Sequence, residues 1–275
     1  KKTNQNLVNN YWIEKTKEIE PIKLMVNTTI KSLVPIKEIN TNSTSFAGSK
    51  ASNFGMLFDM KNDLKLNVKI PECAFVIPFY FYKKHIESNK IDILIEELVL
   101  NKKEYIEQGV IEKYLENIRN LIINSEIDSF LIKDVEIEVR KCSFNNIRFR
   151  SSTNAEDLEG FNGAGLYDSK TGILDNEEKS FQTAIKTVWA STWNYRAFME
   201  REYFGIDQNS VAMGILCHRS FPNEKANGVI ITKNLYRDNS RGFVINTQYG
   251  EIGVVNPPLG INCEQLICYS DLRYK

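Results

Sequence analysis

Apolar residues recur at helical spacing in three parts of the chain. Between residues 91 and 137 they return every three or four positions, and Glu and Lys fill the positions between them, which predicts amphipathic helices with a solvated charged face. Residues 177–201 show the same period and predict one long helix whose tryptophans, Trp189 and Trp193, lie in the core. A third helix is predicted to begin at Ser49, a favourable N-cap residue.

Other segments alternate or form short apolar runs. Ile147 and Phe149 alternate with Arg148 and Arg150, which predicts a short, half-buried strand. Residues 211–217, 228–232 and 242–246 also predict strands. Residues 1–45 are polar and form a lead-in segment, in which only the apolar patch 33–36 is expected to pack on the body.

The most informative stretch follows the Arg150 strand and reads RFRSSTNAEDLEGFNGAGLYDS, residues 148–169. Three glycines, Gly160, Gly163 and Gly165, fall within six positions. Glycines at this density let backbone N–H groups converge on one point, as in loops that bind phosphate oxygens, and Arg150 could grip the same phosphates with its fork of donors. For an isolated Gly-x-x-Gly-x-Gly pattern, a plain polar hairpin loop is the commoner explanation.

The whole string resembles the signature of the nucleotide-binding domain shared by phosphoenolpyruvate synthase and pyruvate phosphate dikinase, approximately VRSSATAEDL, a spacer and then FAGQ. The match covers Arg150–Ser152, Ala155–Leu158, Ala164-Gly165 and Asp168, and the resemblance extends over roughly residues 46–260. The sequence departs from the family at several positions, and four of these departures, at Ser49, Asn154, Leu166 and His218, bear on whether the activity is retained.

Further sites follow from this resemblance alone. The segment around Lys50 is similar to the family's GGKxANLG motif, which implies that Lys50 contacts the nucleotide phosphates; taken by itself, Lys50 would be a surface lysine. The glycine loop, with Gly163, Ala164 and Gly165, would supply backbone donors. By position, a hinge against the adenine would comprise His218, Arg219, Ser220 and Phe221. Thr232 and Glu251 match further nucleotide-contacting positions.

The implied fold is mixed α/β (α+β), of the two-lobed ATP-grasp type. The resemblance divides the chain into a lead-in (residues 1–45) and a nucleotide-binding domain (residues 46–275). Within that domain, residues 46–150 would form the first lobe with its helical insert, and residues 151–275 would carry the glycine loop and the second lobe. We expect the chain to end before the family's later acidic positions, so that the ligands of Mg²⁺ lie outside it.

The implied function is that of the ATP-binding part of a phosphotransferase. In such enzymes ATP phosphorylates a histidine on another domain, and the histidine passes the phosphoryl group to an acceptor. ATP and downstream phosphohistidine and acceptor-binding domains would then be the partners, with Lys50 and Arg150 as the catalytic residues. The four departures leave open a second hypothesis, a non-catalytic nucleotide-sensing or scaffold module.

Composition narrows the function classes. Thirty-five basic and 35 acidic residues give a formal charge of zero, which argues against nucleic-acid binding as the main role. The apolar runs are too short to span a membrane. The five cysteines are scattered without a C-x-x-C pair, which favours reduced core thiols and a reducing compartment such as the cytoplasm.

Overall fold

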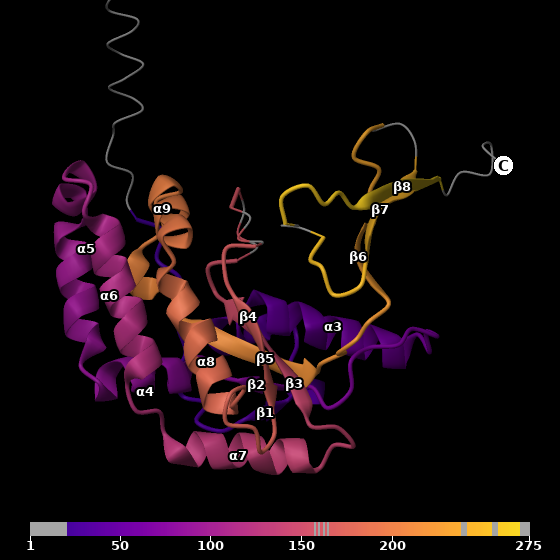
Figure 1. Cartoon of the computed structure of the whole chain (residues 1–275), viewed down its shortest axis with the longest axis horizontal. Coiled ribbons are helices and arrows are strands. Elements are labelled where there is room, and N and C mark those ends of the chain that lie inside the picture. Colours follow the sequence, from indigo (N-terminus) through magenta and orange to yellow (C-terminus); the bar gives the residue numbers. More distant parts are fainter. Residues whose placement is uncertain are drawn as a thin grey trace, which may run out of the picture. The chain divides into compact units, whose positions relative to one another are not determined.

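The computed structural model describes residues 21–156, 158, 160–161, 163, 165–237, 241–254 and 258–269. These contain helices and antiparallel strands (Figure 1), which confirms the mixed α+β class. The strands are β1 (Val34–Pro35), β2 (Phe75–Ile77), β3 (Asn146–Thr153), β4 (Ser169–Ile173), β5 (Met213–Arg219), β6 (Ala226–Ile231), β7 (Gly242–Tyr249) and β8 (Glu264–Tyr269). The helices are α2 (Thr44–Ala47), α3 (Ser49–Asp63), α4 (Phe79–Ser88), α5 (Ile91–Glu107), α6 (Ile111–Asn124), α7 (Ser129–Arg140), α8 (Phe181–Ala190) and α9 (Tyr195–Tyr203).

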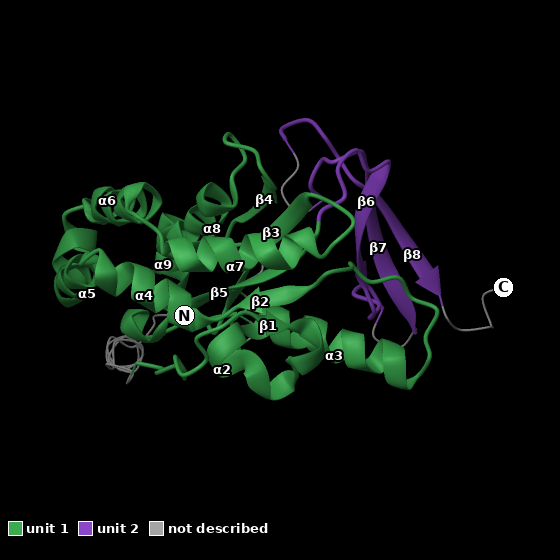
Figure 2. Cartoon of the chain, turned by 90° about the horizontal axis from the view of Figure 1, so that it is seen from below, with its two compact units in different colours: residues 1–219 green, residues 220–275 purple. Residues whose placement is uncertain are grey.

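The chain divides into two compact units, residues 1–219 and residues 220–275 (Figure 2). The boundary between the units therefore follows Arg219, whereas the sequence placed the lobe boundary after Arg150. Both β3 and β5 belong to the first unit, because they pair along seven positions from Ile147 with Arg219 to Thr153 with Met213.

The first unit is built on a five-stranded antiparallel sheet in the order β1-β2-β5-β3-β4. β1 pairs with β2 through Val34 and Val76, so the apolar patch at residues 33–36 packs on the body as expected. The central strand β5 is buried on both faces, which explains why its sequence is a nearly continuous apolar run rather than an alternating one.

Alternate residues of the sheet enter two different hydrophobic clusters. Ile215 and Cys217 of β5 join the larger cluster, which includes residues of α4 to α9. Leu216, between them, joins a smaller cluster with Ala47 of α2 and Ala51 of α3. Because side chains alternate along a strand, α2 and α3 cover one face of the sheet and α4 to α9 cover the other.

The long helix predicted for residues 177–201 is interrupted in the structure. Helix α8 ends at Ala190, a 3₁₀ turn follows over Ser191–Trp193, and α9 begins at Tyr195. The Ser191 hydroxyl donates to the Val188 carbonyl at 2.6 Å, and the extended backbone at Asn194 breaks the helical path. The prediction of one continuous helix was wrong, but Trp189 and Trp193 are buried in the core as expected.

The second unit contains a three-stranded antiparallel sheet in the order β6-β7-β8. Its two predicted strands, residues 228–232 and 242–246, correspond to β6 and β7, and β8 was not predicted. All six residues of β8 are exposed, so this strand lacks the buried, alternating apolar positions on which the prediction of strands depends.

The cysteine prediction needs a correction. Cys73 and Cys142 form a disulfide, whereas Cys217, Cys263 and Cys268 are free. The bond joins the loop before β2 to the segment after α7, two parts of the chain whose proximity no local pattern reveals. The cysteines therefore do not support the predicted reducing compartment. None of the described helices combines the length and the apolar character needed to cross a bilayer.

Candidate functional site

Helix α3 begins in direct contact with the end of β3. Gly48, which precedes the helix, has φ of +83° and lies so close to Ser152 that an added Cβ would come within 2.2 Å of the Ser152 carbonyl oxygen. The Ser152 hydroxyl accepts from the backbone N–H of Ala51 at 2.9 Å and so satisfies a donor of the first helical turn. A glycine at position 48 is therefore required for this approach.

Lys50 in this first turn is held by β3 and the segment after it. Its Nζ donates to the Ser151 carbonyl at 2.9 Å and forms an ion pair with Glu156 Oε1 at 3.0 Å. The Lys50 side chain is 29% exposed and the Glu156 side chain 5%. Lys50 thus remains accessible to a solvent-borne anion, while its carboxylate partner is buried.

The neighbouring Ser49 was predicted to cap α3, and this was wrong. The cap position belongs to Gly48, and the Ser49 hydroxyl instead donates to the Glu156 carbonyl at 2.7 Å. Ser49 and Lys50 therefore hold the backbone and the side chain of the same glutamate.

The negative charge of the same carboxylate also acts on Arg150. This arginine is an exposed residue of β3, yet desolvation by the surrounding protein lowers the pKa of its guanidinium, and the negative charge of Glu156 opposes that shift. The structure therefore places Lys50 beside Ser151, the residue after Arg150, although the two motifs lie a hundred positions apart.

The glycine loop contains two tight turns. The Phe161 N–H donates to the Leu158 carbonyl at 3.0 Å, and the Leu166 N–H donates to the Gly163 carbonyl at 3.2 Å. Gly165, within the second turn, has φ of +79°, a conformation that side chains disfavour. Ala164 lies outside the described residues. Gly163 packs against Glu156, where an added Cβ would meet the Cγ of that glutamate at 3.2 Å.

The expected hinge begins inside a strand. His218 and Arg219 are the last two residues of β5, and the His218 ring is buried and stacks in parallel on Phe54 of α3. His218 Nδ1 lies 2.7 Å from the Arg219 carbonyl. Desolvation, together with Arg150 and Arg148, lowers the pKa of His218 to about 4. The imidazole is therefore neutral at physiological pH.

The remaining predicted residues lie in the second unit. Ser220 and Phe221 follow β5 directly, and Thr232 follows the last residue of β6. The Glu251 carboxylate accepts from the backbone N–H of Asn223, which belongs to the same unit.

Glu156 is a candidate site residue that the sequence analysis does not predict. It belongs to the Ala155-Glu156-Asp157 motif, but the motif alone assigns it no contact. The available signal was its place, an acidic residue shortly after a strand that ends in Arg150, where it can balance basic side chains. The described residues contain no group of three or more His, Cys, Asp or Glu side chains that could hold a metal ion.

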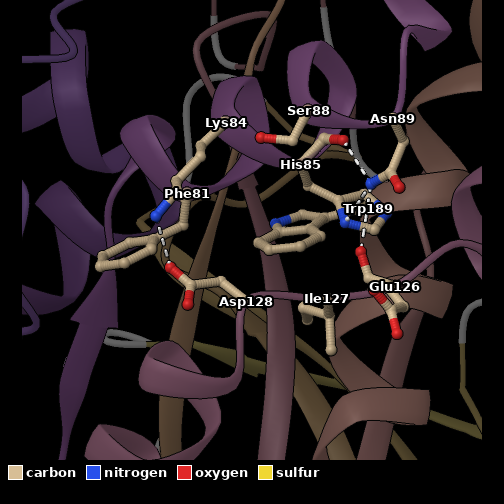
Figure 3. A pocket seen from close by; sticks show the side chains of 9 residues that line it. All are labelled: Phe81, Lys84, His85, Ser88, Asn89, Glu126, Ile127, Asp128 and Trp189. Atoms are coloured by element: carbon tan, nitrogen blue, oxygen red, sulfur yellow. Dashed lines mark hydrogen bonds and ion pairs between the residues drawn. The ribbon is translucent and has the colours of Figure 1, made fainter.

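The first unit also has a polar pocket on the face of the sheet that α4 to α9 cover (Figure 3). It has a volume of about 270 Å³ and lies between α4, the segment 126–128 and α8. Lys84 pairs with Asp128 at 2.7 Å across it. The His85 ring is buried beside Trp189, and its Nε2 lies 3.0 Å from the Ile122 carbonyl in the last turn of α6.

Comparison with known proteins identifies the family. The family model for the pyruvate phosphate dikinase AMP/ATP-binding domain matches residues 44–256. The chain belongs to this family. The match contains Lys50, Arg150, Glu156 and the whole glycine loop, and the family's domain is an ATP-grasp-like nucleotide-binding domain.

Curated relatives agree with this assignment. A rifampicin phosphotransferase from Bacillus cereus is 25% identical over 221 residues, which cover 79% of this chain and 24% of the relative. Phosphoenolpyruvate synthases from Pyrococcus furiosus and Aeropyrum pernix are 22% and 23% identical, over 78% of this chain in each case and 30% and 26% of the relatives. The chain thus spans about a quarter of the length of these relatives.

Proposed function

We propose that this member of the pyruvate phosphate dikinase AMP/ATP-binding family is the ATP-binding part of a phosphotransferase that resembles phosphoenolpyruvate synthase. In the proposed reaction a P–O bond of ATP breaks as a P–N bond forms to a histidine on another domain. The histidine then passes the phosphoryl group to an acceptor, for which pyruvate, a polysaccharide and an antibiotic are candidates.

The observation that carries the proposal is the ion pair of Lys50 and Glu156 beside the end of the Arg150 strand. Lys50 is the more exposed member of this pair, and its Nζ also donates to the carbonyl of Ser151, the residue after Arg150. An ammonium and a guanidinium suit the charge that spreads over a phosphoryl group during transfer. Glu156 would hold Lys50 in place before the nucleotide arrives, and the phosphates would then become a second partner for the ammonium.

The other contacts of the proposed site follow the family pattern. Backbone N–H groups of the loop at Gly163, Ala164 and Gly165 would bind the phosphate oxygens, and residues 218–221 would line the base. Thr232 and Glu251 match further nucleotide-contacting positions of the family pattern. Mg²⁺ would accompany ATP, held by ligands of the parent protein outside the described residues.

The four departures from the family pattern do not favour the alternative of a non-catalytic module. Ser49, Asn154, Leu166 and His218 are all buried. Ser49 bonds to Glu156, and Asn154 donates to the Ser210 carbonyl at 2.9 Å. Substitutions that serve internal packing leave the side chains of Lys50 and Arg150 unchanged, so the four departures give no reason to abandon the phosphotransferase role.

Calorimetric titration of ATP tests the proposal. We expect the wild-type chain to bind ATP and Lys50→Met to lose most of that affinity. Lys84→Met is a matched control. Lys84 is also an ion-paired lysine in a helix of the first unit, but it lines the pocket between α4 and α8. Equal affinities in the wild type and in Lys50→Met, or equal losses in both variants, would contradict the proposed site.

A further inference from the structure

A buried arginine lies beneath the end of the glycine loop. Arg201 of α9 is fully buried. Its guanidinium donates to Gln208 Oε1 at 2.8 Å, to the Thr192 carbonyl at 2.8 Å and to the Tyr167 hydroxyl at 3.2 Å. A buried guanidinium is costly unless its donors are satisfied, so these three contacts fix its position firmly.

Tyr167 is the residue through which this arginine reaches the loop. It follows the second loop turn directly, and its hydroxyl accepts from the Arg201 guanidinium at 3.2 Å. Burial raises the pKa of Tyr167, and the positive charge of Arg201 opposes that shift. The phenol therefore keeps its proton at neutral pH. Through Arg201, which also donates to Gln208 Oε1, the returning end of the loop is linked to the segment after α9.

Asn154 fixes the outgoing end of the loop independently. Its Nδ2 donates to the carbonyls of Met25 and Ser210 at 3.1 and 2.9 Å, and its Oδ1 accepts from the Ala212 N–H at 3.0 Å. With the start of the loop anchored in this way, the position of the returning end depends on Tyr167 and on a longer contact from Asn194 Nδ2 to the Leu166 carbonyl at 3.4 Å.

We propose that Tyr167, held by Arg201, is a positioning residue that fixes the returning end of the glycine loop. By fixing that end it aims the loop's backbone N–H groups at the phosphates, a role that rests on the proposed function. A preorganised loop binds an anion more tightly because less conformational freedom is lost on binding.

The structure offers a matched pair of variants. Tyr167→Phe removes only the hydroxyl that accepts from Arg201. Tyr82→Phe removes an equally buried hydroxyl, which accepts from Trp193 Nε1 at 3.0 Å and also interacts with Arg201 but belongs to α4. Each change deletes a buried hydrogen-bonding group, so both are expected to lower the free energy of unfolding by a similar amount, about 1–2 kcal/mol.

Two measurements separate positioning from general stability. We expect Tyr167→Phe to weaken ATP binding about 3- to 10-fold, because the net free energy of one hydrogen bond is lost. The same change should speed amide hydrogen exchange in peptides that cover the loop. Tyr82→Phe should leave both close to wild type. Unchanged affinity and exchange in Tyr167→Phe, or equal changes in both variants, would overturn the proposal.

The exchange measurement also separates this inference from the proposed function. If the wild-type chain fails to bind ATP, the proposed function is wrong, but faster exchange of the loop in Tyr167→Phe alone would still support the role of Tyr167 in fixing the loop. If ATP binds and exchange is the same in all three proteins, the function stands and the positioning role is refuted.

Discussion

Lys50 Nζ lies 3.0 Å from Glu156 Oε1, and the two residues belong to separate sequence motifs. Glu156 is further held through its backbone by the Ser49 hydroxyl. The ion pair therefore connects the start of α3 to the glycine loop. In the proposed site, the ion pair also sets the charge that an incoming phosphate would meet, namely one partly exposed ammonium whose counter-ion is buried.

The first prediction concerns this ion pair. Lys50→Met should abolish most ATP binding and lower the free energy of unfolding by about 1–3 kcal/mol, because the buried Glu156 carboxylate loses its charged partner. Denaturant unfolding monitored by circular dichroism, alongside ATP titration, measures both effects.

A double variant separates the two roles of Lys50. Adding Glu156→Gln to Lys50→Met removes the unpaired charge, so most of the lost stability should return. ATP affinity should not return, since the ammonium is still absent. Recovery of ATP binding in the double variant would show that Lys50 acts only by neutralising Glu156.

The second prediction concerns Gly165, whose φ is +79°. Gly165→Val should abolish ATP binding, because a branched side chain disfavours this backbone conformation and obstructs the approach of phosphate to the loop. Gly160→Ala is the control, since Gly160 has the same φ and open space around it. If the 163–165 segment binds phosphate, Gly160→Ala retains affinity at a cost of about 1 kcal/mol in stability. Unchanged ATP affinity in Gly165→Val would mean that the loop is only a turn.

Much of the first unit could be predicted from local pattern. The alternation of Ile147 and Phe149 with basic residues marked β3, and the apolar period between residues 91 and 137 marked α5, α6 and α7, because each element buries one regular face. Elements without such a face escaped prediction. β8 is exposed throughout, and the break at Ser191–Asn194 lies within an uninterrupted apolar pattern.

The candidate site was only partly accessible to the same reasoning. Motifs marked Lys50 and Arg150, but nothing local indicated that Ser49 would bond to Glu156 instead of capping its own helix. The disulfide between Cys73 and Cys142 was missed for the same reason. Such partners are set by the packing of α3 on β3 and of distant loops on each other, which one sequence does not encode in any spacing.

The third prediction concerns that disulfide, which closes a sequence separation of 69 residues. Reduction should lower the free energy of unfolding by about 2–4 kcal/mol, because the unfolded chain gains the freedom that the cross-link removed. Thermal unfolding with and without reductant measures the change. The Cys73→Ser/Cys142→Ser variant should resemble the reduced protein and be insensitive to reductant; a reductant effect of equal size in that variant would exclude the disulfide as its cause.

The fourth prediction concerns acid stability. The folded pKa of His218 is about 4, below the ordinary histidine value of about 6.5. Between these pH values the unfolded chain binds more protons than the folded one, so the free energy of unfolding should fall as the pH drops from 6.5 to 4, by up to about 3 kcal/mol. The cause is that a charged imidazole would be buried against Phe54 and would face the positive charges of Arg148 and Arg150.

His218→Phe isolates this contribution, because it keeps an aromatic ring against Phe54 and removes the titrating group. Burial also lowers the pKa of His85, so the variant should still lose some stability in acid. The slope of unfolding free energy against pH should nevertheless be smaller in the variant by up to about 1.4 kcal/mol per pH unit between pH 4.5 and 6. Urea unfolding at several pH values measures both slopes. Identical slopes would mean that His218 is protonated equally in the folded and unfolded chains, and hence that its ring is hydrated in the folded protein.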